Sequence, residues 1–166
     1  YEGSIVEGVL IPTKKRMTAC ISSQVGCSLA CSFCATGRLK RMRNLTYDEI
    51  YDQVVEINNL AKENYQKPLT NIVYMGMGEP LLNYKNTLES IKKITSDEGL
   101  GMASRRITVS TAGIAKMIIK LGDDNVKFNL ALSLHATNDE ARNKIMEIDQ
   151  QNSLGSLAEA LKYYYD

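Results

Sequence analysis

Short apolar runs alternate with longer helical patterns along the chain. Four runs are brief and rich in apolar or β-branched residues: Met17–Ser22, Asn71–Met75, Arg106–Ser110 and Lys127–Leu134. Runs of this length and composition, ended by glycine or polar residues, predict β-strands. Each run is followed by a loop and then by a segment with a different periodicity.

A helical pattern follows each predicted strand. The clearest is Thr46–Asn64, where apolar residues recur at helical spacing and Thr46 forms a capping-box arrangement with Glu49. Further helical patterns run through Leu88–Ile94, through Ile114–Leu121, from near Asn138, and through Ser153–Tyr165. Because strand and helix alternate in this way, we expect a parallel sheet built from right-handed βα units.

The alternation predicts an α/β fold but leaves barrel and open sheet undecided. Four units cannot close an eight-stranded barrel, and no strand follows Ser153–Tyr165. We therefore expect a piece of a larger barrel or sheet. The chain contains no internal repeat, low-complexity tract or Pro/Gly/Ser-rich linker, so we expect one domain over residues 1–166.

Composition sets the broad class of protein. The chain has 166 residues, of which 44% are hydrophobic and 23% charged, as in one soluble globular unit. No stretch approaches the roughly 20 apolar residues of a membrane span, and the first residues do not resemble a signal peptide. We expect a cytoplasmic protein. The net charge of +1 argues neither for nor against a nucleic-acid partner.

The cysteine spacing is the strongest chemical signal. Cys27, Cys31 and Cys34 form a CxxxCxxC loop, which supplies three thiolates to a 4Fe-4S cubane and leaves its fourth iron open as a substrate site. A structural zinc ion is the alternative, but it needs a fourth ligand, which would have to be Cys20 or His135. Clustered thiols in a reducing compartment favour metal binding over disulfides.

Polar residues follow every predicted strand at the point where it ends. After the strands come the cysteine loop, the segment GMGEP, the pair Ser110 and Thr111, and the run Ser133 to His135. Ligands of parallel α/β proteins bind at the carboxyl ends of the strands, because the loops there converge on one face. We therefore expect these four loops to form one site.

Several long motifs resemble one protein family. The runs are SSQVGCSLACSFCATG, RNLT, NIVYMGMGEPLLN, RRITVSTAGI, LALSLHATNDEAR and NKIM. In this order they resemble the RlmN branch of the RlmN/Cfr family of radical S-adenosylmethionine RNA methyltransferases, over nearly the whole chain. The resemblance implies a partial TIM-type radical SAM (β/α)6 barrel, with about four βα units in this chain. It also implies an accessory amino-terminal RNA-binding domain and a carboxyl-terminal barrel part that lie outside the chain.

The activity implied by the resemblance is methylation of carbon 2 of an adenine in 23S ribosomal RNA, and in some members in transfer RNA. The cofactors would be a 4Fe-4S cluster on Cys27, Cys31 and Cys34, and S-adenosylmethionine, whose amino and carboxylate groups bind the open iron. An electron from a donor such as flavodoxin would release a 5'-deoxyadenosyl radical. By resemblance, Gly78 and Glu79 hold the methionyl amine and its surroundings.

The same resemblance assigns further residues to S-adenosylmethionine, namely Ser110, Ser133, Leu134 and His135. The alternative for Glu79 is a loop carboxylate at a turn, which its position at the end of a strand disfavours. Without the resemblance, the two serines would be hydroxyls that close a strand, and His135, the single histidine, would be a structural group.

Two residues are assigned to the RNA step. Cys20 resembles the family cysteine that resolves a covalent RNA–protein intermediate through a transient disulfide bond; otherwise it reads as a buried strand cysteine. Glu7 matches the proton acceptor at the adenine, or is a solvated strand residue. The family's methyl-carrier cysteine has no match here, so we expect it beyond Asp166, and we expect this polypeptide alone not to methylate RNA.

Other interpretations remain open on the sequence. The basic residues Arg38, Lys40, Arg41 and Arg43 are candidates for contact with RNA phosphates, or form a solvated basic turn. The alternative functions are methylation of adenine carbon 8, as in the Cfr branch, another radical enzyme such as an activase or thioether-forming maturase, and a non-catalytic zinc or cluster module. We expect a monomer with an RNA partner and no membrane association.

Overall fold

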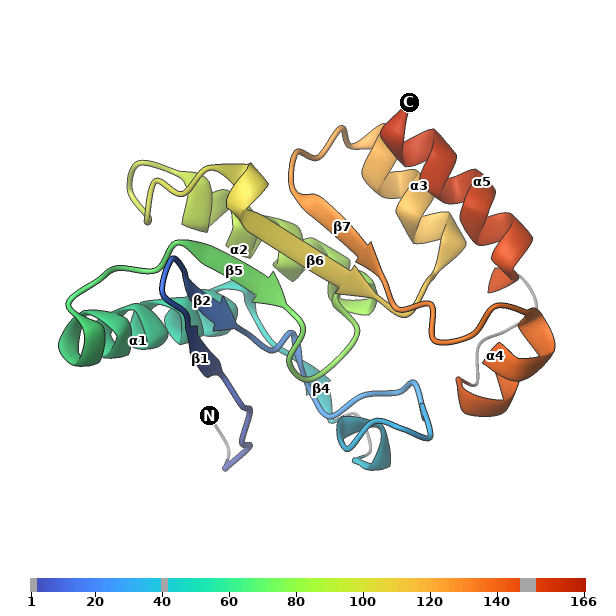
Figure 1. The fold of residues 1–166 in the computed structure, drawn as a ribbon, viewed down its shortest axis with the longest axis horizontal. Helices are drawn as coiled ribbons and strands as arrows, with labels where there is room; N and C mark the ends of the chain where they lie inside the picture. Colours follow the sequence, from blue (N-terminus) through green and yellow to red (C-terminus); the bar gives the residue numbers. More distant parts are fainter. Residues whose placement is uncertain (1–2, 40–41, 147–151) are drawn as a thin grey trace.

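The computed structural model describes residues 3–39, 42–146 and 152–166. A five-stranded sheet has the order β1-β2-β5-β6-β7. Its strands are β1 (Val9–Pro12), β2 (Met17–Cys20), β5 (Asn71–Tyr74), β6 (Ile107–Thr111) and β7 (Asn129–Leu132). β2, β5, β6 and β7 are parallel to one another, and β1 is an antiparallel edge strand. The carboxyl ends of the parallel strands therefore lie along one edge of the sheet (Figure 1).

Helices connect the parallel strands and also follow the last of them. α1 (Tyr47–Tyr65), α2 (Tyr84–Thr95) and α3 (Ala115–Asp123) lie between strands, whereas α4 (Asp139–Ile145) and α5 (Leu154–Tyr165) come after β7. Figure 1 shows α1 and α2 behind the sheet, α5 beside α3 beyond β7, and the short α4 near the ends of the strands. None of the described helices is both long and apolar enough to cross a membrane.

Smaller elements lie around the loops. A two-stranded antiparallel ribbon of β3 (Gln24–Val25) and β4 (Arg43–Asn44) closes the base of the cysteine loop. The remaining elements are the 3-10 helices η1 (Thr36–Arg38), η2 (Pro80–Asn83) and η3 (Ser104–Arg106).

The two faces of the sheet have different surroundings. Alternate strand residues such as Ala19, Ile72 and Ile107 are fully buried and pack with the apolar faces of the helices in one core. Their neighbours Cys20 and Val73 lie on the opposite face and are only partly buried. This second face is thus the accessible side of the sheet, as the period of two in strands requires.

The predicted alternation of strands and helices is confirmed, and with it the α/β class. The capping box of Thr46 and Glu49 is present at the start of α1. β2 ends at Cys20, two residues earlier than predicted, and the Ser22 N–H donates to the Gln53 side chain (2.9 Å). The edge strand β1 and the β3–β4 ribbon were not predicted.

The side-chain amide of Asn83, in the loop after β5, bonds to the backbone at Ser23 and at Leu45. Its side chain is 2% exposed, and its Nδ2 donates to the backbone carbonyls of Ser23 and Leu45, each at 2.8 Å. Asn83→Ala leaves two buried carbonyls without this donor, so we expect the free energy of unfolding to fall by about 2 kcal/mol.

Urea denaturation measures this loss. The control is Asn64→Ala, because Asn64 is exposed and bonds only to the Leu60 carbonyl of its own helix among the described partners. Equal losses of stability in the two variants would contradict the role assigned to Asn83.

Candidate active site

The loops at the carboxyl ends of the parallel strands surround a cavity of about 320 Å³. Eight residues predicted from the sequence line it: Cys27, Cys31, Cys34, Gly78, Glu79, Ser110, Ser133 and His135. They come from the cysteine loop and from the loops after β5, β6 and β7. The expectation that the strand-end residues gather in one place is therefore confirmed.

The cysteine loop is closed by its own backbone. Cys27 N–H donates to the Leu39 carbonyl (3.3 Å), and Cys34 N–H donates to the Cys31 carbonyl (3.0 Å). A side chain at Gly37 would place its Cβ 3.0 Å from the Cys31 carbonyl oxygen, so the turn packs closely there. The Leu29 N–H donates to the Cys27 sulfur (3.4 Å), an arrangement that stabilises a thiolate.

The three thiols of the loop are half-buried and share one cavity. Burial raises the pKa of Cys27 and of Cys31, and the charges of neighbouring thiols and of Glu79 raise both further. A bound metal cluster would instead lower the pKa of these cysteines, because thiolates rather than thiols are the ligands of a metal.

The donor set fits a cubane cluster. Within the described ranges, no three His, Cys, Asp or Glu side chains are arranged to hold one metal ion, as a zinc site requires. In a cubane each thiolate binds a different iron, so the three sulfur atoms do not need to converge on a single ion.

A disulfide bond receives no support from the structure. All four cysteines, which lie within the described residues, are free thiols. Cys20 lies on β2. Burial raises the pKa of its thiol, and the backbone of Met75, a residue that lines the cavity, opposes the rise.

Glu79 joins two of the loops. It is 4% exposed; its Oε1 accepts from Leu81 N–H (3.0 Å), and its Oε2 accepts from Ala112 N–H (2.7 Å) in the loop after β6. Burial raises the pKa of this carboxyl, and these N–H bonds oppose the rise. Each oxygen keeps a further lone pair, so the carboxylate can also accept from a ligand in the cavity.

Gly78 is required by its surroundings. Its φ of 94° lies in the left-handed region, and a Cβ there would lie 2.5 Å from the Cβ of Gln24. Gln24 is fully buried, and its Oε1 accepts from Glu79 N–H (2.9 Å). The close approach of Gly78 to Gln24 therefore sets the direction of the Glu79 backbone.

The loops after β6 and β7 meet across the cavity. The Oγ atoms of Ser110 and Ser133 are 3.4 Å apart, and Ser133 N–H donates to the Thr111 carbonyl (2.9 Å). His135 has a φ of 58° and packs against Phe33 of the cysteine loop, with ring centroids 4.2 Å apart and the ring planes tilted by 45°. Hydroxyl, imidazole and aromatic groups thus line the same cavity as the thiols.

Three predicted residues are not among the described lining residues. Leu134 is 45% exposed, and its carbonyl points away to accept from Arg142. Cys20 lies on the accessible face of β2. Glu7 is exposed in the segment before β1, where its carbonyl accepts from the Ser22 hydroxyl (2.7 Å). The roles assigned to these three stay predictions.

Sequence reasoning missed several residues around the cavity. Phe33 and Met146 line it, although neither was assigned a role. The position of Phe33 between Cys31 and Cys34 was a signal that could have drawn attention to it. Met146 and the supporting Gln24 carry no comparable signal, because their importance arises only from packing between distant segments.

Two of the basic residues between positions 38 and 43 are described by the structure, and one of them is engaged in an ion pair. Arg43 forms a two-bonded ion pair with Glu49, with N–O distances of 2.8 and 2.7 Å. This pair lowers the pKa of Glu49 to about 2. Arg38 is exposed, and its contact with phosphate stays a prediction; Lys40 and Arg41 lie outside the described residues.

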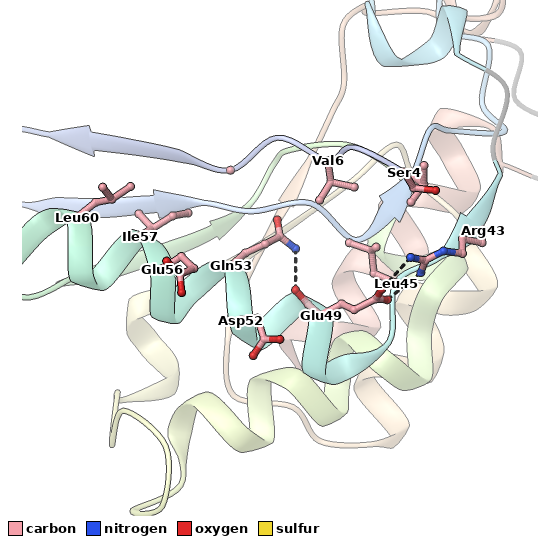
Figure 2. A pocket seen from close by; sticks show the side chains of 12 residues that line it. Ser4, Val6, Arg43, Leu45, Glu49, Asp52, Gln53, Glu56, Ile57 and Leu60 are labelled. Carbon is pink, nitrogen blue, oxygen red and sulfur yellow. Dashed lines mark hydrogen bonds and ion pairs between the residues drawn. The ribbon is translucent and has the colours of Figure 1, made fainter. Parts of the chain in front are cut away.

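A second cavity, of about 460 Å³, lies between residues 4–8 and α1 (Figure 2). Figure 2 shows the Arg43–Glu49 pair at one end and the apolar Ile57 and Leu60 along the helix. None of the residues predicted to be catalytic or to bind a metal or S-adenosylmethionine is among the described residues that line it, although Arg43, a candidate for RNA contact, is. The two cavities are therefore lined by different parts of the chain.

Comparisons with known proteins agree with the geometry. The family model described as "Radical SAM superfamily" matches residues 21–166. A protein of Cytophaga hutchinsonii named "Probable dual-specificity RNA methyltransferase RlmN" is 66% identical over 164 residues, covering 99% of this chain and 45% of that protein. A protein of Buchnera aphidicola named "Dual-specificity RNA methyltransferase RlmN" is 48% identical over 161 residues, covering 96% of this chain and 44% of that protein.

A solved structure is also similar. The crystal structure of a radical SAM methyltransferase from Sphaerobacter thermophilus has a TM-score of 0.92 and 42% sequence identity, and the match covers 96% of this chain and 46% of that chain. The chain spans about half the length of the curated relatives it matches.

The raised pKa of Glu79 predicts a dependence of stability on pH. Because the folded protein then binds more protons than the unfolded chain, the free energy of unfolding falls as the pH rises from 4.5, the ordinary Glu pKa, through the raised value. Glu79→Gln removes this titration. We expect the stability of the unmodified protein to fall relative to the variant as the pH rises across that range, measured by urea denaturation without ligands.

The matched control is Glu63→Gln, because Glu63 is an exposed residue of α1. This variant should follow the pH profile of the unmodified protein. If the Glu79→Gln profile did the same, Glu79 would not carry the titration described.

Proposed function

The chain belongs to the radical S-adenosylmethionine superfamily, and on this premise we propose that it is the catalytic core of an RNA methyltransferase. The reaction is methylation of carbon 2 of an adenine in 23S ribosomal RNA or transfer RNA. The observation that supports this most directly is the cavity where three thiols, a buried carboxylate and two serine hydroxyls meet. Names of relatives that specify RNA methyltransferases support the choice of RNA.

The cysteine loop holds the proposed cluster. Cys27, Cys31 and Cys34 provide one thiolate each, and the Leu29 N–H supports the Cys27 sulfur. A 4Fe-4S cluster bound there would supply the electron that cleaves S-adenosylmethionine to a 5'-deoxyadenosyl radical. The chain's own contribution is to hold the thiolates on a closed loop beside the other residues of the cavity.

The remaining cavity residues orient the cosubstrate. The Glu79 carboxylate accepts from the methionyl ammonium, because its lone pairs toward the cavity remain available. Ser110 and Ser133 offer hydroxyls to ribose and carboxylate oxygens. His135, supported by Phe33, contributes a further polar edge. Gly78 leaves the space that the backbone near the methionyl group requires.

The RNA step uses the accessible side of the sheet. Cys20 faces that side next to Met75, and Glu7 lies in the segment before β1, at the same end of the sheet as the cavity. In the proposal Cys20 resolves the covalent intermediate and Glu7 accepts a proton from the adenine. The partners are RNA and an electron donor such as flavodoxin, and the protein acts as a cytoplasmic monomer, with residues 1–166 forming a radical SAM core domain.

Anaerobic reconstitution tests the cluster. We expect about four iron atoms per chain and an electron paramagnetic resonance signal that changes when S-adenosylmethionine is added. Cys34→Ala should lose the iron because it removes one of three ligands, whereas Cys20→Ala, the control, should retain it. One tightly held zinc ion per chain would instead support the non-catalytic alternative and would refute the proposal.

Photocrosslinking tests the RNA step. An RNA hairpin carrying a photoreactive adenine should crosslink to peptides that contain Glu7 or Cys20, as identified by mass spectrometry. The control is the same hairpin with the photoreactive base moved to its stem. Crosslinks confined to other surfaces, or alteration of a peptide substrate without any RNA crosslink, would favour another radical enzyme.

A further inference from the structure

Helix α4 lies beside the candidate active site instead of covering the sheet. It spans Asp139–Ile145 and begins at Asn138, whose side chain accepts from Ala141 N–H (2.8 Å). Figure 1 shows it near the end of β7 and apart from the layer that contains α3 and α5. The helix is short, yet it carries one of the most deeply buried charged side chains in the described chain.

That side chain is Arg142, which is 1% exposed. Its guanidinium donates to three backbone carbonyls, those of Ala112, of Leu134 (3.3 Å) and of Asn152 (3.3 Å). Burial lowers the pKa of Arg142, but an arginine remains protonated in proteins. A fixed positive charge with several donors therefore lies behind the loops of the site.

Two of these carbonyls belong to loops that line the cavity. Ala112 follows Ser110 by two residues, and its N–H donates to Glu79. Leu134 stands between Ser133 and His135. The glycine next to Ala112 leaves room for the guanidinium, because a Cβ at Gly113 would lie 3.0 Å from Nη2 of Arg142. Arg142 thus bonds to both loops without being among the described residues that line the cavity.

The other end of α4 contacts the cysteine loop. The carbonyl of Ile145 accepts from the backbone N–H (2.9 Å) and the hydroxyl (3.3 Å) of Ser32, which stands between Cys31 and Cys34. Met146, the next residue, is 1% exposed and lines the cavity. One short helix therefore joins the cysteine loop to the loops after β6 and β7.

We propose that Arg142 is a positioning residue for S-adenosylmethionine. Its three bonds to carbonyls fix Ser110, Ser133 and His135 relative to one another, and α4 fixes them relative to the cysteine loop. Arg142 itself is not among the described residues that line the cavity, so it acts through the loops that it bonds to. This inference rests on the proposed function, because it takes S-adenosylmethionine as the ligand that these loops bind.

The test compares Arg142→Met and Arg142→Lys with Arg106→Met in anaerobically reconstituted protein. Arg106 is the control because it is exposed at the opposite end of β6. The dissociation constant of S-adenosylmethionine is measured by titrating its effect on the paramagnetic resonance signal of the reduced cluster. Iron content and the far-ultraviolet circular dichroism spectrum are recorded for every variant.

We expect both Arg142 variants to keep the iron and the spectrum of the unmodified protein but to bind S-adenosylmethionine about tenfold more weakly or worse. Lysine keeps the charge, but its single ammonium cannot reproduce the planar fork that reaches three carbonyls. Arg106→Met should bind normally. Unchanged binding in Arg142→Lys, or loss of folded protein in both Arg142 variants, would overturn the inference.

The outcome for the unmodified protein separates this inference from the proposed function. If that protein takes up no cluster, or takes up a cluster that does not respond to S-adenosylmethionine, the proposed function itself fails. If it binds both and the Arg142 variants bind equally well, only the positioning role fails.

Discussion

Parallel pairing of β2, β5, β6 and β7 is the constraint on which the candidate site depends. The register joins Cys20 to Val73 and Val73 to Thr108, so the strands end at one edge and their loops emerge side by side. A slip of one residue in β6 would turn Ser110 into the helix layer, because strand side chains alternate between faces. The fully buried neighbour Val109 opposes that slip, because it packs in the hydrophobic core.

Electrostatics explains why the site suits positively charged partners. Three thiols and the Glu79 carboxyl surround a small cavity, and burial disfavours ionisation of Cys27, Cys31 and Glu79. Iron ions and an ammonium group would stabilise the ionised forms of these residues. The cation behind the loops, Arg142, is bonded to carbonyls and leaves the cavity free for such ligands.

Local patterns in the sequence predicted the α/β units and most of the cavity, because each depends on residues close together in the chain. The capping box at Thr46 and the loop residues at strand ends are examples of such local information. The β3–β4 ribbon was missed because two residues per strand show no period. The contact of Phe33 with His135 and the bonds of Arg142 were missed because they join segments that only the tertiary fold brings together. The ion pair of Arg43 with Glu49 was missed because Glu49 was considered only as part of the cap.

The two halves of the site differ in the chain entropy needed to assemble them. The thiols lie within eight neighbouring positions, so their loop closes over a short stretch of chain. The bond from Ala112 to Glu79 joins residues 33 apart, and that between Ser32 and Ile145 joins residues 113 apart. The thiol loop therefore depends on contacts between residues close in the chain, whereas the part formed by the loops after β5, β6 and β7 exists only once distant strands have paired.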